Sequence, residues 1–136
     1  MWDENFSPNL SHFYPTWVTL MGSMRRPNVL GSPHYIQHSN HIEPGREGLF
    51  NLIKSNPPTL KYEPGVILAG GDFVIVHGRF SGFGAPVNWI AADIVRLQDG
   101  MLIEHWDVIQ DEVTQEQSKS GLPMFGDTFA TYASAR

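Results

Sequence analysis

The chain has no cysteine among its 136 residues. It can therefore hold neither a disulfide framework nor a catalytic thiolate, which fits a reducing compartment. It also lacks any apolar run near the ~20 residues that a membrane-spanning helix needs. The N-terminal stretch MWDENFSPNL is acidic where a signal peptide would be basic and then apolar. We expect a soluble, cytoplasmic protein with no membrane partner.

A basic surface is missing as well. The nine Lys and Arg residues are scattered among 14 Asp and Glu, the formal net charge is −5, and only Arg25 and Arg26 are adjacent. Without a basic stripe there is no footprint for a phosphate backbone, so nucleic acid is not expected as a partner. The glycine-rich stretches GGDFV and SGFGAP lack the spacing of a phosphate-binding loop and are interpreted as turns.

Hydrophobic residues make up 41% of the chain and aromatic residues 12%. This composition is typical of a globular protein, and its aromatic content favours a pocket or an interface. The length predicts a single domain over 1–136.

The first half of the chain has the apolar spacing of helices. One helix is expected to begin near Pro15, because proline suits a first helical turn, and GREGLFNLIKS predicts a second that Pro57 and Pro58 end. From residue 60 the pattern is that of strands, namely LKY, VILA, DFVIVHGRF, NWIAADIVRL and MLIEHWDVI. Helices followed by antiparallel strands indicate an α+β fold, with an irregular tail over 111–136.

The hairpin RLQDGMLIEHWD decides which side chains share a face of the sheet. A two-residue turn at Asp99-Gly100 would place Asp107 with Ala92, whereas a three-residue loop would place Asp93 opposite His105. We favour the second register, in which Asp93 and Asp107 are diagonal neighbours about 7–8 Å apart. One face then carries Trp89, Ala91, Asp93, Ile103, His105, Asp107 and Ile109, and the other carries Ile94, Arg96, Glu104 and Trp106.

The preceding strand alternates in the same way. His77 shares a face with Phe73, Ile75 and Arg79, while Val74, Val76 and Phe80 lie on the other face. Alternation does not say which face is concave, so His77 is kept as a candidate substrate-binding residue.

Asp107 is the most informative residue of the stretch EHWDVIQDE. A carboxylate among apolar and aromatic side chains loses hydration, so its pKa should rise and it could act as a general acid or base near neutral pH. The structural alternative is that Asp107 pairs with His105 or Arg96, or caps a backbone donor, and does no chemistry.

His38 and His41 are three residues apart and His34 is nearby, so a metal site has to be considered. Pro and Gly interrupt the segment, and histidines in such a place are more often polar pocket-edge or surface residues. We predict no metal and no cofactor.

Taken together, YIQHSNHIEPG, GDFVIVHGRFSG, AADIVRLQDGMLIEHWDVIQ and the late Met124-Phe125 resemble the SnoaL-like branch of the nuclear transport factor 2-like superfamily. The resemblance runs from Tyr35 to about Gln110, and residues 1–30 match poorly. It implies a cone-shaped α+β barrel, with a curved antiparallel sheet wrapped around N-terminal helices, a deep apolar pocket, and a homodimer formed through the outer face of the sheet.

The resemblance also implies roles for individual residues. Asp107 matches the aspartate that acts as general acid/base during aldol closure in SnoaL cyclases, and Asp93 stands where those cyclases are expected to have a histidine. The predicted catalytic residues are Asp107, Asp93, His105 and His38, and the predicted substrate-binding residues are Tyr35, Gln37, Trp89 and His77.

The function this implies is cofactor-independent aldol cyclisation, isomerisation or dehydration of a small apolar carbonyl compound, such as a polyketide or terpenoid. The alternative is a non-catalytic binding or dimeric interaction module of the same fold, because one fold serves many functions.

Overall fold

A computed structural model describes residues 32–126 of the chain. Within this range the elements are β1 (Ile36–Gln37), α2 (Gly45–Ser55), β2 (Lys61–Gly70), β3 (Phe73–Ser81), β4 (Trp89–Gln98) and β5 (Met101–Asp111). The helix predicted near Pro15 lies outside the described residues. Among residues 32–126 no helix has the length and hydrophobicity that crossing a bilayer requires.

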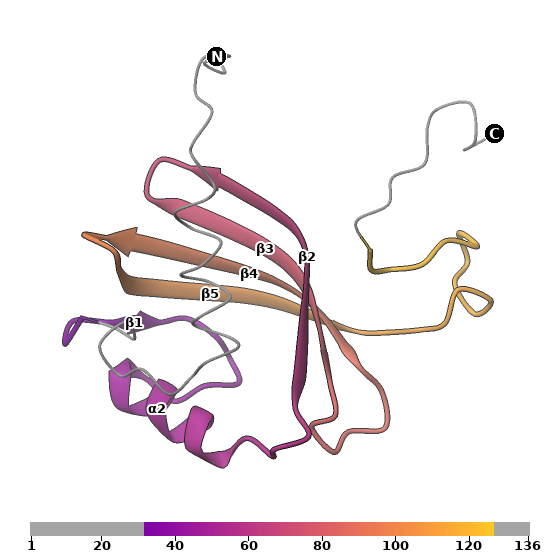
Figure 1. The fold of residues 1–136 in the computed structure, drawn as a ribbon, viewed down its shortest axis with the longest axis horizontal. Coiled ribbons are helices and arrows are strands. Elements are labelled where there is room, and N and C mark those ends of the chain that lie inside the picture. The colour runs from indigo at the N-terminus through magenta and orange to yellow at the C-terminus, as the bar shows by residue number, and fades with distance from the viewer. Residues whose placement is uncertain (1–31, 127–136) are drawn as a thin grey trace.

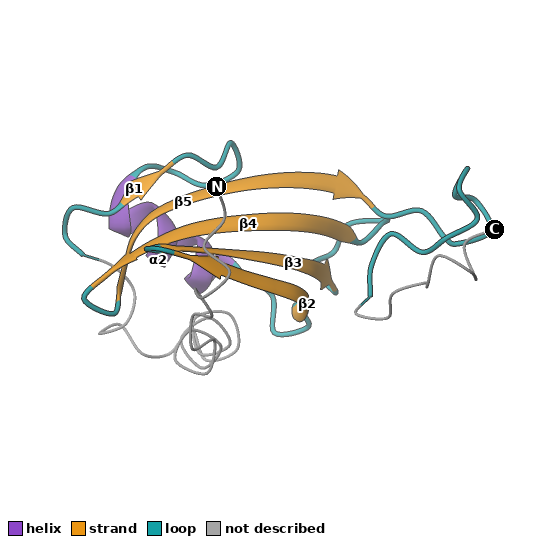
Figure 2. Cartoon of the chain, turned by 90° about the horizontal axis from the view of Figure 1, so that it is seen from above, coloured by secondary structure: helices purple, strands orange, loops and turns teal. Residues whose placement is uncertain are grey.

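The five strands form one curved sheet in the order β1-β5-β4-β3-β2, with antiparallel pairs except for the parallel pair of β1 and β5. The sheet curls over α2 (Figure 1), and seen from above the strands lie side by side in front of the helix (Figure 2). The α+β fold predicted from the order of the elements is confirmed.

Helix α2 begins and ends where the sequence indicates. Pro44 precedes it in an extended conformation, Glu47 lies in the first turn and Lys54 in the last, so both charges suit the helix dipole. Asn56 then leaves the helical conformation immediately before two prolines. The apolar side of α2 packs on the inner face of the sheet, against a buried cluster formed by Tyr35, Val74, Val76, Val95 and Leu102.

Two of the strand predictions need correction. The stretches LKY and VILA form the single strand β2, which contains an irregularity between Pro64 and Ile67. A proline is tolerated here because β2 is an edge strand, where one missing N–H need not interrupt a ladder. The stretch around Ile36 and Gln37 forms β1, although its sequence is too polar and too short to have predicted a strand.

The predicted hairpin register is wrong. The turn is the two-residue Asp99-Gly100, with φ values of 51° and 76°, as a type I′ turn requires. A bulge between Arg96 and Leu97 then shifts the pairing by one residue, so Asp93 lies directly opposite Asp107 rather than opposite His105.

The predicted faces of β4 and β5 are nevertheless correct for most residues. Trp89, Ala91 and Asp93 do share the inner face with His105, Asp107 and Ile109, and Trp106 lies on the outer face with Ile94. On β3 the inner residues Val74 and Val76 are 1% and 0% exposed, so the concave face is the one that does not carry His77.

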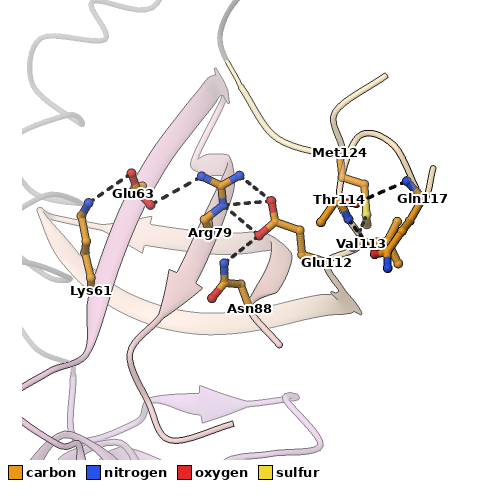
Figure 3. Close-up of polar contacts among 9 residues, drawn as sticks. All are labelled: Lys61, Glu63, Arg79, Asn88, Glu112, Val113, Thr114, Gln117 and Met124. Atoms are coloured by element: carbon orange, nitrogen blue, oxygen red, sulfur yellow. Dashed lines mark hydrogen bonds and ion pairs between the residues drawn. The ribbon is translucent and has the colours of Figure 1, made fainter. Parts of the chain in front are cut away.

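After β5 the chain has neither helix nor strand from residue 112 to residue 126. A clamp of side chains holds the start of this tail (Figure 3). Both Glu112 carboxylate oxygens accept hydrogen bonds from Arg79 Nε, at 3.1 and 3.0 Å, and one accepts from Asn88 Nδ2 at 3.0 Å. The Arg79 guanidinium also lies 4.6 Å from the ring centre of Phe125. The clamp therefore joins β3, the β3–β4 loop and the tail.

Candidate active site

A cavity of about 360 Å³ lies between α2 and the inner face of the sheet. This volume is at the small end of the range for small-molecule sites. Its apolar and aromatic lining includes Leu49, Leu52, Ile53, Leu60, Phe80, Phe83, Trp89, Leu102 and Ile109, and its polar lining includes Tyr35, His41, Asp93, His105 and Asp107. The amphipathic helix and the alternating strands thus turn their apolar sides towards a common space.

Three titratable side chains meet on the β4–β5 side of this cavity. Asp93, His105 and Asp107 each present one atom, and these atoms all lie within 4.8 Å of one another. Asp93 and His105 are 3% and 8% exposed, whereas Asp107 is half-buried. The bulge in the hairpin makes this grouping possible, because it brings both aspartates to the same level on neighbouring strands.

The His105 ring lies between two partners. Its Nε2 is 2.8 Å from Asp93 Oδ1, and its Nδ1 is 2.8 Å from Gln37 Oε1. Gln37 also donates from Nε2 to the Tyr35 hydroxyl oxygen at 2.6 Å. Pairing of β1 with β5 places Gln37 directly beside His105, which is why this contact forms.

Asp107 has a different partner. Its Oδ2 accepts a hydrogen bond from Ser39 Oγ at 2.7 Å, and no ion pair reaches it among residues 32–126. The two ion pairs considered for Asp107 do not form: His105 pairs with Asp93, and Arg96 pairs with Glu104 on the outer face.

Burial shapes the electrostatics of the site. Desolvation raises the pKa of Asp93, while the hydrogen bond and charge of His105 act in the opposite direction and Asp107 adds to the rise. The second carboxylate oxygen of Asp93, Oδ2, is buried without a hydrogen-bond partner in the described part of the chain. The pKa of Tyr35 is also raised, first by burial and then by the charges of Asp107 and Asp93. Burial thus raises the pKa of one aspartate of the group, Asp93.

An aromatic wall faces these polar groups. Trp89 packs against Phe83, with ring centres 4.6 Å apart, and His41 meets Trp89 edge-on at 5.3 Å. Trp89 therefore lies where the sequence analysis placed it, as a pocket residue, and its role in binding stays a prediction.

Two of the predicted site residues lie elsewhere. His38 stacks on Trp106 at 4.7 Å and pairs with Glu104 at 2.8 Å, both on the outer face of the sheet. His77 shares the outer face of β3 and approaches Phe125 of the tail at 6.2 Å. Neither His38 nor His77 lines the cavity. Gln37 does not line it either, but its side chain contacts two residues that do, His105 and Tyr35.

The same geometry bears on metal binding. His38 and His41 point to different surroundings, so they do not form the pair of ligands that their spacing suggests. The donor set that could hold a divalent cation is instead Asp93, His105 and Asp107, which offers one nitrogen and two carboxylates. A hydrogen bond between Asp93 and His105 accounts for their approach without a metal ion.

Ser39 is the polar residue that the sequence analysis missed. It is 7% exposed and contacts Asp107 from a loop that has no regular structure. The available signal was the alternation of Tyr35, Gln37, Ser39 and His41, which places every second side chain of this extended segment on one side.

No protein family model and no curated protein sequence matches this chain. Solved structures do. A candidate SnoaL-like polyketide cyclase from Jannaschia sp. CCS1 is 17% identical and superposes with a TM-score of 0.60 over 79% of this chain and 91% of its own. A candidate ketosteroid isomerase from Kribbella flavida DSM 17836 is 14% identical, with a TM-score of 0.61 over 76% of this chain and 78% of its own. TsrD from Streptomyces laurentii is 24% identical, with a TM-score of 0.54 over 74% of this chain and 84% of its own.

These likenesses concern the fold, because one architecture serves several reactions. They agree with the resemblance that the motifs indicated between Tyr35 and Gln110. The described part of the chain has the cone-shaped α+β fold of the SnoaL-like and nuclear transport factor 2-like proteins.

Proposed function

We propose that the protein is a cofactor-independent enzyme that moves a proton next to a carbonyl group of a small apolar substrate, as in aldol cyclisation, isomerisation or dehydration. The observation that carries the proposal is the group formed by Asp93, His105 and Asp107 at one side of an otherwise apolar cavity. Two facing carboxylates with different partners are a common arrangement for separate acid and base roles. Polyketide and terpenoid carbonyl compounds are the substrate classes that fit such a lining.

In this mechanism Asp107 is the base. It removes a proton from the carbon beside the substrate carbonyl, and the electron pair of that C–H bond moves into an enolate. The enolate then attacks a second carbonyl carbon in a cyclisation, or accepts a proton at another carbon in an isomerisation. In either case Asp107 returns the proton, so it ends the cycle ionised.

Tyr35 is the donor for the developing enolate oxygen. The Tyr35 oxygen already accepts a hydrogen bond from Gln37 Nε2, so its own hydrogen can be directed at an oxygen in the cavity. The raised pKa of Tyr35 keeps that hydrogen in place at neutral pH. A donor held in a site of low polarity stabilises developing negative charge far better than water does.

The test uses 5-nitrobenzisoxazole, a neutral aromatic probe. Removal of its C3 proton by a base breaks the ring N–O bond and releases a coloured cyanophenolate. The wild-type protein should accelerate this reaction above the rate in acetate buffer of equal carboxylate concentration. Asp107→Asn should lower the rate roughly 100-fold or more, in line with the usual contribution of a general base.

Asp111→Asn is the matched control, because Asp111 is an exposed aspartate on the same strand. It should keep the wild-type rate. An Asp107→Asn protein that turns over the probe like wild type would refute the role of Asp107. A wild-type protein that binds 2-naphthol, detected by fluorescence, but does not accelerate the elimination would favour the binding module.

We propose in addition that the outer face of the sheet forms a homodimer. Large apolar side chains are exposed there on three strands: Leu68 is 60%, Ile75 39% and Val108 68% exposed. An open sheet normally keeps such a face polar if it stays in water, so a second copy of the same face is a fitting cover. Sedimentation should give a dimer for wild type and a monomer for Val108→Lys, and a monomeric wild type would contradict the proposal.

A further inference from the structure

Two neighbouring groups fix the direction of the Ser39 hydroxyl group. Ser39 Oγ accepts a hydrogen bond from the backbone N–H of His41 at 3.2 Å, and it lies 2.7 Å from Asp107 Oδ2. A hydroxyl group has one hydrogen to donate. With the His41 N–H supplying a hydrogen from the other side, the Ser39 hydrogen faces the carboxylate. Such a bond favours the ionised form of an acid.

The orientation of the Gln37 amide is fixed in a similar way. The backbone N–H of Ser39 donates to Gln37 Oε1 at 2.9 Å, so this atom is the oxygen and the other is the nitrogen that donates to Tyr35. The same oxygen lies 2.8 Å from His105 Nδ1. Because an amide oxygen can only accept, Nδ1 of His105 must carry a hydrogen.

This leaves Nε2 of His105 facing Asp93 Oδ1 at 2.8 Å. If neither atom carried a hydrogen, two lone pairs would meet at hydrogen-bond distance inside a buried site, which is strongly unfavourable. One proton must therefore lie between Asp93 and His105, on the oxygen or on the nitrogen. In both forms the pair as a whole is neutral.

We propose that the segment of residues 37 to 39 is a positioning element that gives the two facing carboxylates different states. Ser39 keeps Asp107 ionised and ready to accept a proton, while Gln37 orients His105 so that Asp93 and His105 hold one proton between them. This inference rests on the proposed function, because a proton-accepting Asp107 matters only if the cavity performs proton transfer.

The groups that share the cavity with Asp107 support this division. Tyr35 and His41 approach from the segment before α2, Asp93 from β4 and His105 from β5, and no Lys or Arg among the described residues lines the cavity. Without a Lys or Arg in this lining, the ionised form of Asp107 depends on hydrogen-bond donors and on the overall neutrality of the pair formed by Asp93 and His105. The burial that raises the pKa of Asp93 acts in the same direction, since it disfavours a second negative charge.

The experiment follows the Asp107 carboxylate and the His105 ring by NMR in the full-length, ligand-free protein, so it does not depend on turnover. The Asp107 side-chain carboxyl carbon, labelled with ¹³C and assigned from its absence in Asp107→Asn, is titrated with pH. In Ser39→Ala its titration should move upward by about 1 pH unit, because a hydrogen bond to a charged group is lost. Ser55→Ala removes a serine of the cavity lining whose hydroxyl donates to the Leu52 carbonyl, not to Asp107, and should leave the Asp107 titration unchanged.

The second readout is the ¹⁵N chemical shift of the His105 ring. In the wild type Nδ1 should carry a hydrogen at every pH at which the protein is folded. Gln37→Met keeps the length of the side chain but removes the acceptor, so a population with a bare Nδ1 should appear. A merely structural role of Gln37 would not produce this change.

An unmoved Asp107 titration in Ser39→Ala, or a wild-type His105 with a bare Nδ1, would overturn the inference. Either result would leave the proposed function intact if Asp107→Asn still abolished elimination of 5-nitrobenzisoxazole. Conversely, failure of wild type to accelerate that reaction would remove the proposed function, while the NMR result would still decide whether Ser39 acts on Asp107 and Gln37 on His105.

Discussion

Asp93 and Asp107 occupy directly opposite positions on β4 and β5, yet each is bound to a different partner. Two carboxylates at such close quarters cannot both be charged and unpaired without strong repulsion. The partners resolve this conflict: His105 lies against Asp93, and Ser39 donates to Asp107.

Replacement of Asp93 by Asn should change how stability depends on pH. Because burial raises the folded-state pKa of Asp93, its contribution to the free energy of unfolding is fully present below its unfolded pKa of about 3.9 and is lost as pH rises through the folded value. Asn does not ionise and can still donate to His105. The variant should therefore gain stability relative to wild type as pH rises from 4 to 8, measured by urea unfolding. Parallel stability profiles would contradict a raised pKa.

Loss of the Glu112 clamp should destabilise the fold at neutral pH. Burial alone would raise the pKa of Glu112, but hydrogen bonds from Arg79 and Asn88 bring it below its ordinary value. The stabilisation is therefore present above the unfolded pKa of about 4.3 and is lost as pH falls through the lower folded value. Glu112→Gln should cost roughly 1–2 kcal/mol at pH 7 and much less near pH 3.

Lys61→Ala provides the comparison for this clamp. The Lys61 side chain is 67% exposed and its Nζ lies 3.4 Å from Glu63 Oε1. The free energy of unfolding should therefore change by no more than about 0.5 kcal/mol. If Glu112→Gln and Lys61→Ala lowered the free energy of unfolding equally, the clamp would contribute no more than an ordinary surface ion pair.

Gly48→Ala should destabilise the protein although alanine is the better helix former. A Cβ at Gly48 would stand 1.9 Å from the backbone oxygen of Glu43, an atom that cannot move without the chain. The cost should be roughly 1–3 kcal/mol, the range for overpacking, instead of the gain of up to about 1 kcal/mol expected in an open helix. Gly70→Ala, where nothing lies within 4 Å, should be close to neutral. Thermal unfolding of both variants measures the difference, and a stabilised Gly48→Ala would be the contrary result.

Removal of metal ions should leave proton transfer unchanged. Protein dialysed against EDTA should process 5-nitrobenzisoxazole at the untreated rate. Added Zn²⁺ should instead inhibit, because it would displace the proton that Asp93 and His105 share and would occupy Asp107. Loss of the rate in EDTA with recovery on adding metal would show that these three residues hold a catalytic cation.

Much of the sheet could be predicted because alternation of side chains depends only on local sequence. The sharing of a face by Asp93, His105 and Asp107 follows from it. The register could not be predicted, because the bulge beside Arg96 adds one residue to one strand and no residue type announces it. The turn at Asp99-Gly100 did carry its usual signal, but the bulge offset its effect on the pairing.

The supporting residues of the site were harder to predict for another reason. Ser39 and Gln37 act through contacts with β5, a strand far away in the sequence, and nothing in the local pattern marks a serine for a buried carboxylate. His38 was predicted as a site residue because its residue type suggested chemistry. Its place in an alternating segment puts it on the outer face of the sheet, against Trp106.

The short strand β1 consists of only Ile36 and Gln37, followed by one further backbone bond from the His38 N–H to the His105 carbonyl at 2.9 Å. Edge elements of this size open far more often than the body of a sheet. Detaching this edge would withdraw the Gln37 and Ser39 side chains together and leave β2 to β5 paired. If the cavity performs the proposed proton transfer, the detached form would be folded but inactive, and amide hydrogen exchange at His38 would report how often this form occurs.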